Sequence, residues 1–103
     1  MRVLMETAEL QKKAAGIVSV LDRKFKVRRD VQLCFTQLME EIGELARDIN
    51  LPRLRSKQPD AQSLEGEFAD VLLQLSKLAE MHGIDMEKAV LGKIEALKKR
   101  HGV

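Results

Sequence analysis

Hydrophobic residues recur at helical spacing along most of the chain, and their pattern predicts four helices. In residues 30–49 the apolar positions follow one another at steps of four, three, four, three and four; they are Val31, Phe35, Leu38, Ile42, Leu45 and Ile49. Such steps place side chains on one face of an α-helix. Similar stripes predict helices over residues 6–25, 63–82 and 86–100. We expect the stripes to form a common core.

The segments between these stretches carry helix-breaking and helix-capping residues. Residues 50–62 contain two prolines, Pro52 and Pro59, and proline fixes φ and disfavours helix in the residue before it, so this segment is predicted to be a loop. Gly83 is the expected C-terminal stop of the third helix, and Asp85 is the expected N-cap of the fourth. Because connections between bundled helices are short, the second and third helices are expected to pack antiparallel.

Length and composition agree with a small helical domain. The chain has 103 residues, which predicts a single domain over residues 1–103. Hydrophobic residues make up 45% and charged residues 33%, a balance that excludes a disordered tail and a membrane protein. Aromatic residues are only 3%, all of them Phe, so the core must be built from helix-compatible aliphatic side chains. We therefore predict an all-α fold of four helices.

Charge and cysteine content narrow the function classes further. The net charge of +2 is too small to indicate a nucleic-acid-binding protein, and the basic run of residues 23–29 is interpreted as a solvated turn in preference to a phosphate-binding patch. Cys34 is alone and cannot form an internal disulfide, and the first residues have no apolar signal region, so a cytoplasmic location is expected. No apolar run approaches the length of a membrane span.

Two pairs of acidic residues are the main candidates for chemistry. Glu41 and Glu44 lie in the second predicted helix, and Glu67 and Asp70 lie in the third. The two acids of each pair are three positions apart. At about 100° per residue, each pair lies roughly 100° from its own apolar stripe and in the same rotational sense. Antiparallel packing of the two stripes keeps such pairs on the same side. The four carboxylates are therefore predicted to share one edge of the helix pair.

An edge of four carboxylates implies a cationic ligand. Two like charges about 4 Å apart repel by roughly 4 kcal/mol at an effective dielectric of 20, and a bound cation relieves this repulsion. Ligands that are all oxygen, without a thiolate or a suitably spaced histidine, favour Mg²⁺ or Mn²⁺ over zinc. The alternative interpretation is that each pair belongs to an ordinary solvated helix flank.

At this point the motif resembles that of a known family. Glu40-Glu41-x-x-Glu44, a gap of 22 residues and Glu67-x-x-Asp70 are similar to the EExxE and ExxD motifs of the all-α nucleoside triphosphate pyrophosphohydrolases, the MazG and dimeric dUTPase superfamily. The resemblance covers about two thirds of the chain. It implies a four-helix MazG-like bundle completed by homo-oligomerisation, and hydrolysis of a nucleoside triphosphate or deoxynucleoside triphosphate to the monophosphate and pyrophosphate.

The resemblance also implies roles for individual residues. Glu41, Glu44, Glu67 and Asp70 would be Mg²⁺ ligands. Glu40 and Glu41 are the catalytic candidates, although Glu40 projects almost opposite the core and is either a base behind the ligands or a solvated side chain. Lys93 and Arg100 match basic positions of the family's downstream motif and would bind the substrate triphosphate.

The sequence departs from the family at positions that bear on the substrate. Leu97 stands where the downstream motif has Asn, and His101-Gly102 stands where it has Tyr-Pro. Leu51 occupies the position where some relatives use a Trp to stack on the base. Base recognition would then fall to a Phe, to backbone groups or to a neighbouring subunit, but Phe35 and Phe68 lie on apolar stripes and are interpreted as packing residues.

Two broader questions follow from the same residues. A single acidic helix pair offers little concave surface to enclose a nucleotide, so we expect a homodimer or homotetramer.

The competing class of function is a non-catalytic helical interaction module, or an inactive relative whose acids are a solvated flank. A di-iron bundle is disfavoured because it needs Glu-x-x-His pairs, which the sequence lacks. The base and sugar preference stays open.

Overall fold

The computed structural model describes residues 6–55 and 57–103, and within these ranges it contains five helices and no strand. The helices are α1 Thr7–Phe25, α2 Val31–Ile49, α3 Leu51–Arg55, α4 Ala61–Met81 and α5 Met86–His101. The all-α prediction is confirmed. The four predicted helices correspond to α1, α2, α4 and α5, and each observed boundary lies within two residues of the predicted one.

The short helix α3 corrects the prediction that residues 50–62 form a loop throughout. Pro52 occupies the second position of α3, where the first helical turn has no intrahelical partner for its N–H and proline is tolerated. The turn is closed by the carbonyl of Asn50, which accepts from the N–H groups of Arg53 and Leu54 at 3.1 and 3.0 Å. The second proline, Pro59, lies outside both α3 and α4.

The predicted caps of α4 and α5 are confirmed. The Asp85 side chain accepts a hydrogen bond from the backbone N–H of Lys88 at 3.2 Å, as an N-cap does. After α4, Gly83 has a φ of +66°, in the left-handed region that favours glycine. Its N–H donates to the backbone carbonyl of Glu80, and the N–H of Ile84 donates to the backbone carbonyl of Ala79, both at 2.9 Å. This is the Schellman pattern of helix termination.

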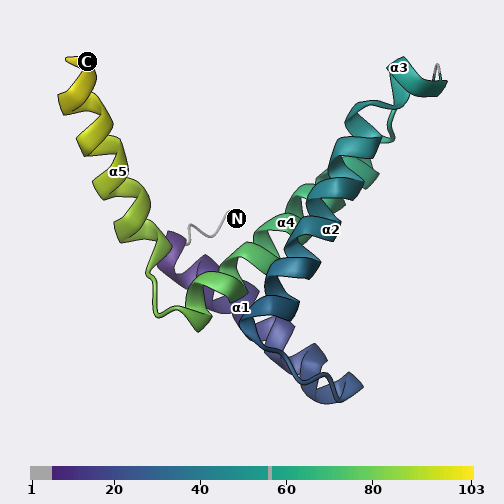
Figure 1. The fold of residues 1–103 in the computed structure, drawn as a ribbon, viewed down its shortest axis with the longest axis horizontal. Helices are drawn as coiled ribbons and strands as arrows, with labels where there is room; N and C mark the ends of the chain where they lie inside the picture. The colour runs from purple at the N-terminus through teal and green to yellow at the C-terminus, as the bar shows by residue number, and fades with distance from the viewer. Residues whose placement is uncertain (1–5, 56) are drawn as a thin grey trace, which may run out of the picture.

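Helix α4 is the central element of the fold. Helix α2 lies beside it and runs in the opposite direction, while α1 crosses the C-terminal part of α4 (Figure 1). The Cys34 thiol of α2 lies 3.6 Å from the carbonyl oxygen of Gln74, and Lys77 donates to the Ser19 hydroxyl of α1 at 2.8 Å. Helix α5 diverges from the α2–α4 pair, and its main packing contact is with α1.

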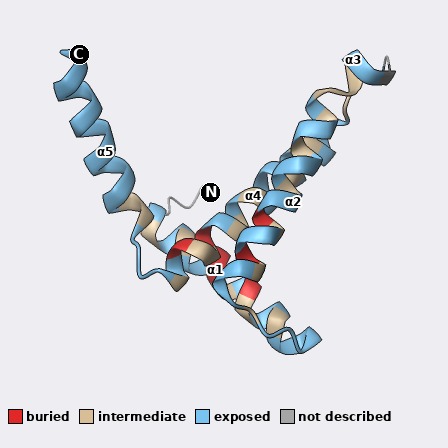
Figure 2. Cartoon of the chain, in the orientation of Figure 1, coloured by how far each residue is buried: buried red, intermediate tan, exposed pale blue. Residues whose placement is uncertain are grey.

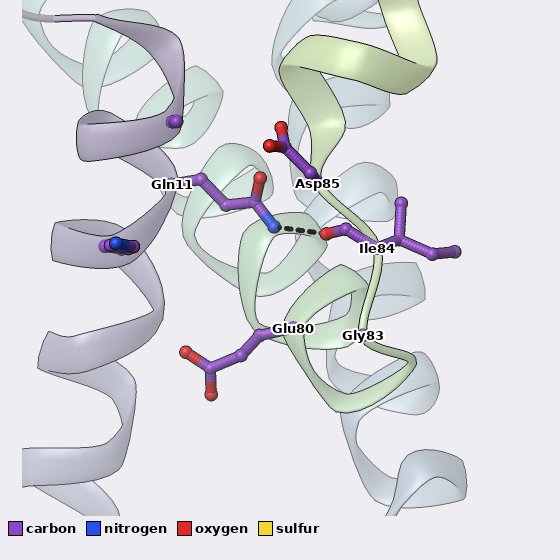
Figure 3. A pocket seen from close by; sticks show the side chains of 7 residues that line it. Gln11, Glu80, Gly83, Ile84 and Asp85 are labelled. Atoms are coloured by element: carbon purple, nitrogen blue, oxygen red, sulfur yellow. Dashed lines mark hydrogen bonds between the residues drawn. The ribbon is translucent and has the colours of Figure 1, made fainter.

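A polar bridge fixes the start of α5. The Gln11 side chain of α1 donates to the carbonyl of Ile84 at 2.8 Å (Figure 3). It also accepts from the backbone N–H of Met86 at 2.8 Å. A shallow pocket of about 280 Å³, lined by residues that include Glu80 and Asp85, lies beside this bridge. The pocket is formed by α1 and the α4–α5 turn, so it is separate from the acidic residues of α2.

The buried core is small and lies where three helices meet (Figure 2). Its members come from α1, α2 and α4 and are mostly small side chains: Ala14, Ala15, Val18, Cys34, Leu38, Ser76 and Ala79. Small side chains allow the helix backbones to approach closely. Among the described residues none of α5 is buried.

The prediction that the apolar stripes form the core is therefore wrong for the single chain. Of the six stripe residues in α2, only Leu38 is buried, and Phe35 is 51% exposed. In α4, Phe68 is 58% exposed, so the interpretation of Phe35 and Phe68 as packing residues is wrong for the single chain as well. The physical reason is that no helix in the described parts of the chain covers the exposed portions of these faces.

Size measures describe the same open arrangement. The accessible surface is 8272 Å², whereas a compact monomer of 11.7 kDa exposes about 5900 Å². The radius of gyration is 16.4 Å, against about 13 Å for a compact domain of this length. The excess surface includes the apolar faces of α2, α4 and α5. Within the described ranges, no helix combines the length and the apolar character needed to cross a bilayer.

Candidate functional site

The packing of α2 against α4 brings acidic residues of the two helices together. Glu41 of α2 is half-buried, and its pKa is raised, first by burial and then by the negative charges of Asp70, Glu44 and Glu40. The effect of Asp70 acts across the helix pair. The rotational argument from the sequence predicted that these carboxylates share one edge, and the effect of Asp70 on the pKa of Glu41 agrees with that placement.

A second contact between carboxyl groups lies further along the same edge. The pKa of Glu67 in α4 is raised, first by burial, then by the neighbouring Asp48 carboxyl group and by the charge of Glu44. Arg47 acts in the opposite direction and is the weakest of these influences. Asp48 was not among the predicted site residues. Its spacing from Glu41, seven residues or about two helical turns, is the sequence signal that could have identified it.

Two carboxylate oxygens on this edge are buried without a partner. Oε2 of Glu41 and Oε2 of Glu67 accept no hydrogen bond, and the same is true of Oε1 of Gln37. The ion pairs among the described residues join other side chains, namely Asp22 with Arg29, Lys77 with Glu80, and Glu95 with Lys98. Because a buried carboxylate without a counter-charge costs free energy, the oxygens of Glu41 and Glu67 fit a cation.

The side chains do not converge on a single point. In the described parts of the chain, no three acidic, histidine or cysteine side chains are grouped as a metal-ligand set requires. Glu44 and Asp70 point into solvent more than Glu41 and Glu67, which are half-buried. The helices therefore set the four acids along one edge, and their side chains would have to rotate to share one ion.

The remaining predicted site residues are placed differently. Glu40 is exposed, and of the three acidic neighbours that raise the pKa of Glu41 it has the smallest effect. Lys93 and Arg100 are exposed on α5, which diverges from the α2–α4 pair (Figure 1). Neither forms an ion pair with an acid of the described chain. A single chain thus brings together the predicted acids but leaves the predicted basic residues on a separate helix.

A polar network lies at one end of the acidic edge, which is the flank of the α2–α4 pair that carries Glu41, Glu44, Glu67 and Asp70. This end is the one nearer the N-terminus of α2. Arg29 donates to both carboxylate oxygens of Asp22, at 2.6 and 3.0 Å, and to Oε1 of Gln74 at 3.2 Å. Its hydrogen bond and charge lower the pKa of Asp22. The interpretation of residues 23–29 as a solvated turn is wrong for Arg29, whose side chain is only 8% exposed. Arg29 is committed to structure and is not free to bind phosphate.

These features define the class: an all-α protein in which an EExxE motif and an ExxD motif face the same edge of an antiparallel helix pair. Residues 29–102 match the family model described as the MazG nucleotide pyrophosphohydrolase domain. The chain therefore belongs to the MazG nucleotide pyrophosphohydrolase family. The match spans α2 to α5, and α1, which supplies Ala14, Ala15 and Val18 to the core, lies outside it.

The chain is also similar to a curated bacterial protein. The chain is 35% identical to the uncharacterized protein YvdC of Bacillus subtilis (strain 168), over 61% of this chain and 68% of YvdC. No solved structure matches the chain. The family assignment indicates a hydrolase that acts on nucleotide phosphoric anhydrides.

Proposed function

We propose that the chain is a Mg²⁺-dependent nucleoside triphosphate pyrophosphohydrolase, which cleaves a nucleoside triphosphate or deoxynucleoside triphosphate into the monophosphate and pyrophosphate. The observation that carries the proposal is the pair of buried carboxylate oxygens without partners, on Glu41 and Glu67, along an edge that also holds Glu44 and Asp70. Membership of the MazG family supports the reaction class. We treat residues 1–103 as one domain with this activity.

The four acids of the two motifs are the proposed ligands of the metal. Glu41 and Glu44 from α2 and Glu67 and Asp70 from α4 supply only carboxylate oxygens, which suit Mg²⁺, and Mn²⁺ is the natural substitute. Mg²⁺ held by these residues would supply the polarisation of phosphoryl oxygens and the acidification of the attacking water. The two oxygens that lack a partner in the described chain would then gain one.

The other proposed roles follow from position. Glu40 precedes Glu41 and has an exposed carboxylate, which is suited to accept a proton from the attacking water. Lys93 and Arg100 would neutralise the triphosphate. Because α5 diverges from the acids of its own chain, we propose that these two side chains reach the site from α5 of a second copy.

We therefore propose that the active form is a homodimer or a homotetramer. Two observations support it. The chain exposes 8272 Å², about 2400 Å² more than a compact monomer of its mass, and standard protein interfaces bury about 800 Å² on each partner. The apolar face of α5, which includes Ile94 at 44% exposure and Leu97 at 39%, is not covered by any other helix that the structure describes.

The test is pyrophosphate release from a panel of nucleoside triphosphates in the presence of Mg²⁺. Glu41→Gln and Asp70→Asn each remove one charge from the proposed ligand set without changing side-chain size. We expect each to lower kcat/KM by more than the roughly 10–100-fold lost when an outer partner of a metal ligand is removed.

The matched control is Glu65→Gln, which makes the same change on the opposite flank of α4, where Glu65 is exposed. This variant is expected to keep wild-type activity. Release of pyrophosphate at equal rates by the wild type, Glu41→Gln and Asp70→Asn would contradict the proposed ligands. A wild type that hydrolyses none of the panel would favour the alternative, a non-catalytic helical interaction module.

A further inference from the structure

Gln37 lies on the acidic edge but is not part of either acidic motif. It precedes Glu41 by four residues, which is about one helical turn, so both side chains lie on the same flank of α2. Its side chain is half-buried, and its Oε1 accepts no hydrogen bond. We propose that the Gln37 carboxamide hydrogen-bonds the base of the bound nucleotide and helps to determine which base is accepted. This inference rests on the proposed function.

The chemistry of the edge changes along its length. At one end, Asp48, Glu44 and Glu41 of α2 face Glu67 and Asp70 of α4. One turn beyond Glu41 and one turn beyond Asp70, the residues on the same flanks are neutral carboxamides, Gln37 and Gln74. A nucleotide has the same polarity, since its phosphates need a cation and its base does not. The carboxamide end therefore suits the uncharged part of the substrate.

The two carboxamides differ in what they already bind. Oε1 of Gln74 accepts from Arg29 at 3.2 Å and lies 3.9 Å from the Cys34 thiol, so this group is held by its own chain. Oε1 of Gln37 has no such donor. Of the two amide oxygens beside the acids, that of Gln37 is thus the one without a donor from the described chain.

A carboxamide is suited to recognise a base edge. It presents a donor and an acceptor side by side, and each base presents donor and acceptor groups on its edge. Gln37 is about 6 Å along the helix axis from Glu41, so a phosphate held at Glu41 leaves the attached nucleoside within reach of the amide. A buried acceptor that gains a donor from the ligand contributes to affinity, because the unpaired group is costly before binding.

The test uses Gln37→Met, which keeps the length of the side chain and removes its hydrogen bonds. KM and kcat are measured for four nucleoside triphosphates with different bases, and inorganic tripolyphosphate is tested as a competitive inhibitor. We expect KM for the preferred nucleotide to rise about 10–100-fold and selectivity among bases to fall, as loss of a hydrogen bond to substrate implies. The inhibition constant of tripolyphosphate, which has no base, is expected to stay at the wild-type value.

Gln32→Met is the matched control, because it makes the same substitution on the opposite flank of the same helix, where Gln32 is exposed. Gln37→Ala is the second variant, in case methionine disturbs packing, and the same pattern is expected. Unchanged base selectivity in a variant that remains folded, or an equal loss of tripolyphosphate binding, would overturn the role of Gln37 and leave the proposed function standing. A wild type that releases no pyrophosphate from any nucleotide would overturn the proposed function itself.

Discussion

Asp48 of α2 lies beside Glu67 of α4, and after burial this neighbouring carboxyl group is the main cause that raises the pKa of Glu67. Two carboxylates side by side repel each other, so the neutral form of Glu67 is favoured. A second raised pKa, that of Glu41, lies on the same edge and has the same causes, burial and neighbouring negative charge. The metal-free edge is thus a place where the fold holds carboxylates closer together than their charges favour.

The first prediction concerns the pH dependence of the metal-free protein. Because the folded-state pKa values of Glu41 and Glu67 lie above the unfolded value of 4.5, their contribution to stability is fully present below pH 4.5 and is lost as pH rises through the folded values. The melting temperature in a chelator should therefore fall as pH is raised from about 5 to 8. At lower pH the trend reverses, since Asp22, with a pKa below its usual 3.8, then loses its pairing with Arg29.

The variant Glu41→Gln gives the control for this profile. It removes one of the two carboxyl groups whose ionisation destabilises the metal-free fold, so its melting temperature should depend less on pH than that of the wild type. A wild-type melting temperature that rises steadily from pH 5 to pH 8 would contradict the assignment of these two carboxyl groups.

The second prediction isolates Asp48. Asp48→Asn removes the negative charge opposite Glu67 but keeps the shape of the side chain. At neutral pH without metal, this variant should melt at a higher temperature than the wild type, because Glu67 can then ionise beside a neutral amide. Asp48→Glu, which keeps the charge, should not show the increase. If Asp48→Asn melts at a lower temperature, Asp48 is a stabilising partner of Glu67 and not a source of repulsion.

The sequence predicts those features of the fold and the site that depend on residues close together in the chain. The caps at Asp85 and Gly83 depend on a few neighbouring residues, so their positions could be predicted. The acidic edge could be placed because rotation about a helix axis is set by residue number alone, and the antiparallel pairing of α2 and α4 followed from their short connection. Asp48 was missed because it lies outside both motifs, four positions after Glu44.

The burial of the stripes could not be predicted in the same way. The spacing of Phe35 and Phe68 shows which face of each helix is apolar, but not what covers that face. Among residues 6–55 and 57–103 nothing covers these two rings, and both are more than half exposed. Likewise, Pro52 excludes a helix interior but not a first turn, which is why α3 was missed. The placement of Lys93 on a separate arm depends on the path of α5, which the Gln11 bridge helps to set.

The third prediction is that Mg²⁺ stabilises the fold. A ligand that binds only the folded state stabilises it in proportion to the logarithm of its concentration. With about 10 mM Mg²⁺ and a dissociation constant of about 1 mM, the gain is about 1.4 kcal/mol, or about 6–10 °C in melting temperature for a domain of this size. Glu41→Gln should lose most of this shift and Glu65→Gln should keep it. An unchanged wild-type melting curve at this concentration would exclude the proposed metal site.

The fourth prediction tests whether the site is shared between two copies of the chain. Light scattering should give a mass of two or four times 11.7 kDa. Ile94→Glu places a charge in the exposed apolar face of α5 and should shift the protein to a monomer that releases no pyrophosphate, whereas Glu95→Gln, on the adjacent residue, should leave mass and activity unchanged.

Mixing two inactive variants separates a shared site from a merely oligomeric one. If the acids of one copy work with Lys93 of another, Glu41→Gln and Lys93→Ala each abolish activity alone. After exchange of subunits, a mixed assembly has one site with intact acids from the Lys93→Ala copy and an intact Lys93 from the Glu41→Gln copy. Pyrophosphate release should then reappear in the mixture. If each site drew all its residues from one chain, every site in the mixture would still carry one defect, and no activity would return.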